Sequence, residues 1–289
     1  MAAGWLYEPV HADVRDAWWL HQIRCDVRTP YQHVQIADTK LGTTLFCDSN
    51  VQSAELGQLH FHEAECVPAM SLADRPTRAL VIGCSEGTVP LILAEAGFDL
   101  VEQVDLDGDC VALCAEHLPY GFTHDDVRAA ERGDGPVRLR YGDGVAHVRE
   151  AHEAGRTYDL IVLDLPEEHA ETDGGKATGR GFLERCRGLL APGGVLSTHV
   201  SRPYISLPTA DSAGSLQDIW RAFGEVFGTR VYFRSPEQPW TAIMLGRPDE
   251  VDDPVGRMIA EFDHLPYKPR TLEAADLRPA THLPRVLRG

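Results

Sequence analysis

From Thr77 onwards the sequence alternates between short apolar segments and amphipathic segments, and this alternation restricts the fold more than any other feature. The apolar segments have the length and composition of β-strands, and helical patterns lie between them. They are RALVIG (78–83), VEQVDLD (101–107), VRLRYGD (137–143), YDLIVLD (158–164) and GGVLSTHV (193–200). The pattern predicts an α/β fold: a doubly wound, mostly parallel Rossmann-like sheet with a ligand crevice at the carboxyl ends of its strands. RVYFRS (230–235) and WTAIMLG (240–246) lie close enough together to form an antiparallel hairpin.

The first part of the chain has a different pattern. HVQIADT (33–39) and TTLFCDS (43–49) alternate apolar and polar residues, which predicts a β-hairpin, and residues 53–70 are expected to form a helix. We therefore expect a small N-terminal domain of β-strands and a helix over residues 1–72 and a Rossmann-like catalytic domain over residues 73–289. Trp18 and Trp19 are expected in the core or at a subunit interface, and the chain is expected to form a homodimer or homotetramer.

The net charge and the cysteine pattern indicate which binding partners and which metal or disulfide sites to expect. A formal net charge of −17 over 289 residues argues against nucleic acid and anionic membranes as partners and favours a cationic one. The seven cysteines contain no CxxC pair, so neither a disulfide framework nor a zinc site is indicated. His60 and His62 are two residues apart in a helical pattern and do not share a face, so no metal site is expected there. Without a signal peptide or a long apolar segment, the chain is expected to be cytosolic.

The loop after the first catalytic strand reads Gly83-Cys84-Ser85-Glu86-Gly87. A dinucleotide-binding loop would have glycine at position 85, and Glu86 would face the pyrophosphate. Two like charges about 4 Å apart repel by roughly 4 kcal/mol at an effective dielectric constant of about 20, so pyrophosphate is a poor ligand for this loop. A nucleoside that carries a cation suits it better, because Glu86 can bind the ammonium group of S-adenosylmethionine or of its decarboxylated form.

Carboxylates recur at the ends of the next three strands. The second strand ends in Asp105-Leu106-Asp107, where an acid can accept hydrogen bonds from ribose hydroxyls. The third ends in Asp143-Gly144, which we expect near the adenine amino group, and the fourth ends in Asp164. These strand ends meet at one edge of a parallel sheet, so together they predict a site for a sulfonium nucleoside.

These motifs resemble those of the polyamine aminopropyltransferases, that is, spermidine synthase and its relatives within the class I S-adenosylmethionine-dependent fold. The resemblance spans nearly the whole chain. It includes the Tyr-Gln stretch of TPYQHVQIADT, the LFCDSNVQ stretch, Glu63, the VIGCSEG loop, DLD, YGDG, YDLIVLDLPEE and, near the C-terminus, HLPRVL. Class I methyltransferases mostly lack the N-terminal hairpin, which makes the resemblance more specific.

The resemblance implies roles for individual residues. Asp164 would be the base that accepts a proton from the attacking amine, next to Glu167 and Glu168. The implied cofactor-binding residues are Gln32, Gln52, His62, Gly83, Glu86, Gly87, Asp105, Leu106, Asp143, Gly144 and Asp164. Phe61, Glu167 and Trp240 would lie on the substrate side, and residues 165–180 would form a mobile lid.

Several positions depart from the family pattern. Gly57-Gln58 replaces an Asp-Glu pair, Phe61 replaces a tyrosine, and Asp164-Leu165-Pro166-Glu167 replaces Asp-Ser-Ser-Asp. The departures lie on the polyamine side, whereas the nucleoside acids are intact. Our first interpretation is therefore methyl transfer from S-adenosylmethionine to a small amine. The alternatives are aminopropyl transfer from decarboxylated S-adenosylmethionine, intramolecular cyclisation or elimination of the sulfonium, and a nucleoside-binding scaffold without activity.

Overall fold

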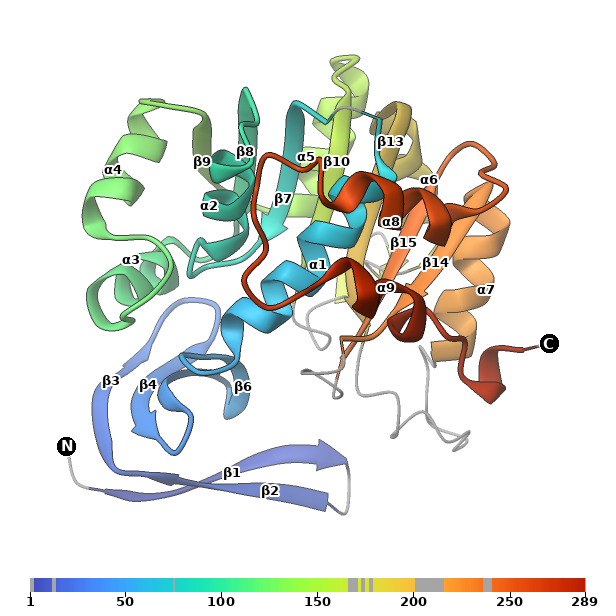
Figure 1. The fold of residues 1–289 in the computed structure, drawn as a ribbon. Coiled ribbons are helices and arrows are strands. Elements are labelled where there is room, and N and C mark those ends of the chain that lie inside the picture. Colours follow the sequence, from blue (N-terminus) through green and yellow to red (C-terminus); the bar gives the residue numbers. More distant parts are fainter. Residues whose placement is uncertain are drawn as a thin grey trace.

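The computed structural model describes most of the chain (Figure 1). The described residues are 3–11, 14–74, 76–165, 171–172, 175–176, 179–200, 216–235 and 241–288.

One seven-stranded sheet forms the centre of the structure, with strand order β14-β15-β13-β10-β7-β8-β9. The strands from β13 to β9 run parallel to one another, and β15 is antiparallel to both β13 and β14. Their bounds are β7 (Arg78–Gly83), β8 (Leu100–Asp105), β9 (Val137–Tyr141), β10 (Tyr158–Asp164), β13 (Leu190–Val200), β14 (Thr229–Phe233) and β15 (Ala242–Arg247). The predicted α/β fold and its antiparallel hairpin are confirmed.

Helices cover both faces of this sheet because its strands are apolar on both sides. In β7, for example, Ala79 and Val81 belong to one apolar core, whereas Leu80 and Ile82 belong to the other. The helices that contribute to the first core are α1 (Gln58–Leu72), α2 (Thr88–Glu95), α3 (Gly108–His117), α4 (His124–Arg132), α8 (Pro254–Phe262) and α9 (Ala274–Ala280). Those that contribute to the second are α5 (Gly144–Glu153), α6 (Arg180–Leu189) and α7 (Leu216–Val226), together with the short helix η2 (Arg285–Leu287).

Two small antiparallel sheets precede α1. The first pairs β1 (Gly4–His11) with β2 (Val14–Leu20), and the second has the order β3 (Gln22–Arg28), β4 (His33–Thr39), β5 (Gly42–Cys47), β6 (Asn50–Ala54). The pairing of β4 with β5 confirms the predicted hairpin. Trp18 packs against Phe46 and donates its indole N–H to Glu8 at 2.7 Å, whereas Trp19 is 41% exposed. A further short pair joins β11 (Glu171–Thr172) to β12 (Gly175–Lys176).

Helix α1 links the N-terminal strands to the large sheet and packs in the first core beside β13 and β10. The division at residues 72 and 73 stays a prediction. A separate cluster of buried residues from β3, β4, β5 and α3 packs the N-terminal sheet against the large domain. Within the described residues, no helix has both the length and the apolar character that crossing a membrane requires.

Glu63 fastens the C-terminal segment to α1. Its side chain is fully buried and accepts hydrogen bonds from the hydroxyl of Tyr267 (2.6 Å) and the backbone N–H groups of Arg270 (2.8 Å) and Thr271 (2.7 Å). The hydroxyl of Thr271 donates a fourth bond at 2.5 Å. Since the carboxylate is saturated by these donors, Glu63 serves the fold.

Candidate active site

The loop between β7 and α2 lies directly against the end of β10. Gly83 has a φ of +88°, and a Cβ atom there would lie 1.9 Å from the carbonyl oxygen of Asp164, so only glycine fits. The backbone N–H of Cys84 donates to that same carbonyl at 3.3 Å. The side chain of Gln103, on β8, donates to the carbonyls of Gly83 (3.0 Å) and Cys84 (2.8 Å). These contacts hold Glu86 and Asp164 near each other.

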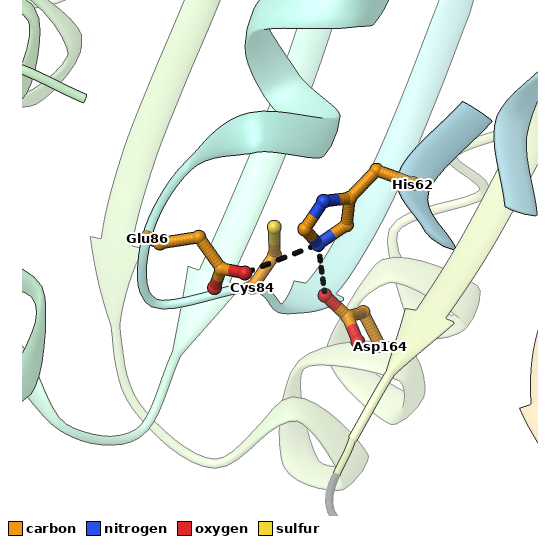
Figure 2. Close-up of side chains that lie close together, drawn as sticks. All are labelled: His62, Cys84, Glu86 and Asp164. Atoms are coloured by element: carbon orange, nitrogen blue, oxygen red, sulfur yellow. Dashed lines mark ion pairs between the residues drawn. The ribbon is translucent and has the colours of Figure 1, made fainter. Parts of the chain in front are cut away.

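His62 lies between Glu86 and Asp164 (Figure 2). Its Nε2 is 3.1 Å from Glu86 Oε1 and 4.0 Å from Asp164 Oδ2, and its Nδ1 is 3.2 Å from Gln58 Oε1. The side chains of His62 and Glu86 are only 2% and 8% exposed. Helix α1 therefore presents an imidazole to the two carboxylates that the sequence assigned to the site.

A second imidazole approaches the other oxygen of Asp164. His199, on β13, places Nδ1 3.6 Å from Asp164 Oδ1 and 3.5 Å from Oε1 of Glu65, which comes from α1. The hydroxyl of Ser197, two residues earlier in the strand, donates to the backbone carbonyl of Glu65 at 2.7 Å and ties β13 to the helix. The ring of Phe61 packs edge-on against both imidazoles, 5.1 Å from His62 and 5.3 Å from His199.

Burial and neighbouring charges shift the pKa values of Asp164, His62 and Glu86. Burial, with the carboxylates of Glu65 and Glu86, raises the pKa of Asp164 to about 7, against the opposing effect of His199 and His62. Burial disfavours the imidazolium of His62, but Glu86, Asp164 and Glu65 outweigh it and raise the pKa of His62. Burial likewise disfavours ionised Glu86, but the hydrogen bond and charge of His62 leave its pKa lowered. Asp164 is thus suited to exchange a proton near neutral pH.

Cys84 completes the group drawn in Figure 2, with a left-handed backbone (φ +65°) that is uncommon for a residue other than glycine. Burial and the nearby carboxylates of Glu86 and Asp164 raise the pKa of its thiol well above the usual value. The thiol is therefore protonated at neutral pH and is a poor nucleophile.

The cluster has the composition of a cation-binding site. The donor atoms of His62, Cys84, Glu86 and Asp164 lie within 4.8 Å of one another, as do those of Glu65, Asp164 and His199. Among the described residues, three carboxylates face two imidazoles, so the cluster carries a net negative charge when Asp164 is ionised, even with both imidazoles protonated. An ammonium group, a sulfonium group or a metal ion would balance that charge.

The end of β8 carries a second buried carboxylate site. Asp105 is 4% exposed and accepts hydrogen bonds from the hydroxyl of Ser85 (2.9 Å) and the backbone N–H of Asp107 (2.8 Å). Burial raises its pKa to about 7. Asp107 accepts from the N–H of Cys110 at the start of α3, and from the side chain of Gln32 at 2.9 Å. Gln32 therefore reaches the strand end from the loop between β3 and β4, and its ligand-binding role stays a prediction.

Some of the other predicted site residues have local structural roles, and two are exposed. Asp143 caps α5 by accepting from the N–H of Val145 at 2.7 Å, and a Cβ at Gly144 would collide with Ile82. Gly87 begins α2 with a φ of +76°, and a Cβ there would collide with Phe122. Leu106 is 46% exposed, and Gln52 is exposed on β6. Their ligand-binding roles stay predictions.

Comparison with known proteins identifies the family. No family model matches the chain. A polyamine aminopropyltransferase from Prochlorococcus marinus is 31% identical over 205 residues, which cover 70% of this chain and 67% of that protein. The chain belongs to the polyamine aminopropyltransferase family.

Other comparisons agree with this family. A polyamine aminopropyltransferase from Pyrobaculum neutrophilum is 29% identical over 181 residues, and the chain spans only 60% of that relative's length. The crystal structure of spermidine synthase from Thermotoga maritima superposes with a TM-score of 0.79 at 15% identity, and the match covers 99% of this chain and 93% of that one. The fold is therefore that of spermidine synthase over nearly the whole chain. These findings favour the aminopropyl alternative and give no support to methyl transfer, our first interpretation.

The structure brings four of the predicted site residues into one cluster, which also contains Glu65 and His199. His62, Glu86, Asp164 and Phe61 form one cluster, whereas Glu167, Trp240 and most of the predicted lid at 165–180 lie outside the described residues. Our reading of the sequence missed Glu65 and His199. A signal for each was present, since Glu65 is an acid within an apolar helix and His199 is a polar residue at the end of a parallel strand.

Proposed function

We propose that this protein transfers an aminopropyl group from decarboxylated S-adenosylmethionine to an amine. The observation that carries the proposal is the charge imbalance of the buried cluster, in which Glu65, Glu86 and Asp164 face two imidazoles among the described residues. Buried carboxylates in excess of their counter-ions take up a proton, as the raised pKa of Asp164 indicates, or bind a cation. The reactants expected from the family, a sulfonium nucleoside and an amine, both carry a positive charge.

The residues divide the work as follows in this proposal. Asp105 binds the ribose, Asp143 lies near the adenine, and Glu86 and Asp164 bind the positively charged groups. The amine nitrogen forms a bond to the aminopropyl carbon next to the sulfonium, the bond from that carbon to sulfur breaks, and methylthioadenosine leaves. Asp164 accepts the proton that the attacking ammonium group must lose, and its pKa of about 7 suits that task. Phe61 provides an apolar wall beside the two imidazoles.

Product analysis tests the reaction. We would incubate the protein with decarboxylated S-adenosylmethionine and putrescine, and separately with S-adenosylmethionine, with and without putrescine. Methylthioadenosine together with a putrescine adduct heavier by one aminopropyl group is the expected outcome. S-adenosylhomocysteine would establish methyl transfer instead, and methylthioadenosine without an adduct would establish intramolecular cyclisation or elimination. A metal ion bound with high affinity in place of either nucleoside would count against a sulfonium site.

Asp105→Ala tests the nucleoside part of the proposal. We expect methylthioadenosine, which carries the ribose but no charge, to bind more weakly by roughly 1–3 kcal/mol, the usual loss for one hydrogen bond to a charged group. Isothermal titration calorimetry measures the change. Unchanged affinity in a variant with wild-type circular dichroism would remove Asp105 from the ribose site.

The cytosolic location and a homodimeric or homotetrameric assembly remain part of the proposal. Trp5, Tyr7 and Trp19 are 58%, 60% and 41% exposed on the β1–β2 hairpin, which supports a contact surface there.

A further inference from the structure

Glu65 is a buried carboxylate without a hydrogen-bond donor among the described residues. Its side chain is 0% exposed, and neither of its carboxylate oxygens has a hydrogen-bond partner there. A buried ion without hydrogen bonds is costly unless a neighbouring charge compensates it. The imidazole of His199, 3.5 Å away, is the nearest such group that the described structure provides.

His199 is shared between two carboxylates at nearly equal distances. Its Nδ1 lies 3.5 Å from Glu65 and 3.6 Å from Asp164. On the other side of Asp164, His62 is much closer to Glu86 (3.1 Å) than to Asp164 (4.0 Å). His62 is therefore engaged mainly by Glu86, whereas Glu65 and Asp164 compete for the imidazole of His199.

We propose that Glu65 is a positioning residue that engages the His199 imidazole and thereby keeps Asp164 free to act as the base. Glu65 is too deeply buried to touch a substrate, so it acts only through His199 and through its own charge. Without Glu65, His199 would pair with Asp164 alone. The resulting ion pair would stabilise the Asp164 carboxylate and make it a weaker base. This inference rests on the proposed function in one respect, the role of Asp164 as proton acceptor.

The charged groups around Asp164 agree with this assignment. Among the described residues they are His62 and Glu65 from α1, Glu86 and the Cys84 thiol from the β7–α2 loop, and His199 from β13. After burial, Glu65 is the largest influence that raises the pKa of Asp164, and His199 is the largest that lowers it. Glu65 and His199 thus act on Asp164 in opposite directions.

Substitutions that preserve shape separate these two effects. The variants are Glu65→Gln, His199→Gln, the double variant with both changes, and Glu95→Gln as a matched control that removes a remote, exposed carboxylate. The readout is the titration of the Asp164 carboxyl in ligand-free protein. It is followed by ¹³C NMR with carboxyl-labelled aspartate, and the signal is assigned by its loss in Asp164→Asn.

We expect shifts of opposite sign. Glu65→Gln lowers the pKa of Asp164 by about 1–3 units and His199→Gln raises it by a similar amount, because one charge within a few ångströms is removed in each case. The double variant titrates close to wild type, and Glu95→Gln does not move the signal. Glu65→Asp retains the charge and gives a smaller shift than Glu65→Gln. Shifts of the same sign in both single variants, or no shift in His199→Gln, would overturn the proposal.

Turnover supplies a second readout that a purely structural role would not produce. With decarboxylated S-adenosylmethionine and putrescine, the acidic limb of the kcat profile moves to lower pH in Glu65→Gln and to higher pH in His199→Gln, while affinity for uncharged methylthioadenosine is unchanged. Failure of the proposed function would leave the NMR shifts as predicted with no aminopropyl product. Failure of the present inference would leave product formation in wild type and an unmoved Asp164 signal.

Discussion

Asp164→Asn lowers turnover by about 10²–10⁴-fold, the usual contribution of a general base, while leaving methylthioadenosine affinity nearly unchanged. The amide keeps the shape of the side chain and an oxygen that can accept a hydrogen bond, but it cannot take up a proton. In the native protein, the pKa of Asp164 is raised to about 7 by its burial and by the charges of Glu65 and Glu86. Its carboxylate is therefore basic enough to take a proton from an ammonium group held against it. Single-turnover formation of methylthioadenosine measures the chemical step directly.

Two outcomes would contradict this role. Normal turnover in Asp164→Asn would mean that the carboxylate only positions the amine. A many-fold loss of methylthioadenosine affinity, with turnover at saturation intact, would place Asp164 in the nucleoside site. Glu95→Gln, which removes an exposed carboxylate at the end of α2, provides the control for a change in net charge.

The sequence was sufficient to predict the large sheet because the determinants of that sheet are local. The parallel strands are short, largely apolar segments, of which β7, β8 and β10 end in a glycine or an acid, and such strands need no long-range information to be recognised. Glu86, Asp105 and Asp164 follow from the same logic, since parallel strands bring their carboxyl ends to one edge. The charge of Glu86 and the residue at position 85 separate this loop from a pyrophosphate loop, and its ligand stays a prediction.

The N-terminal strands β1 and β2 were harder to predict because their side chains do not divide into an apolar and a polar face. Trp5 and Tyr7 are 58% and 60% exposed, whereas Glu8 on the same hairpin is 1% exposed and accepts the indole N–H of Trp18. On β1 the buried face carries Leu6 and the acid Glu8, so burial does not follow the alternation of apolar and polar residues on which strand prediction depends.

Glu65 and His199 could not be paired from the sequence for a different reason. They lie on α1 and β13, far apart in the chain, and only the packing of that helix on the sheet, fixed in part by the Ser197 hydroxyl, brings them within 3.5 Å. Taken alone, an acid in a helix is more often exposed than buried. The protonation of Asp164 therefore depends on tertiary contacts that spacing and composition do not encode.

Glu63, two residues before Glu65, gives the largest effect on stability. Glu63→Ala is expected to lower the free energy of unfolding by about 3–5 kcal/mol, because it leaves the buried hydroxyl of Tyr267 and the N–H groups of Arg270 and Thr271 without their acceptor. The midpoint of urea denaturation, followed by tryptophan fluorescence, measures the change.

Tyr267→Phe is the matched control, because it removes one of the four hydrogen bonds to Glu63 and leaves the carboxylate with three donors. It should cost about 1.5–3 kcal/mol, the usual contribution of one hydrogen bond to a charged group. An effect of Glu63→Ala no larger than that of Tyr267→Phe would show that the C-terminal segment is held by its apolar contacts. If Glu63→Ala instead remained stable but lost nucleoside binding, Glu63 would belong to the active site. The assignment of Glu63 to the fold and of Glu65 to the active site would then be wrong.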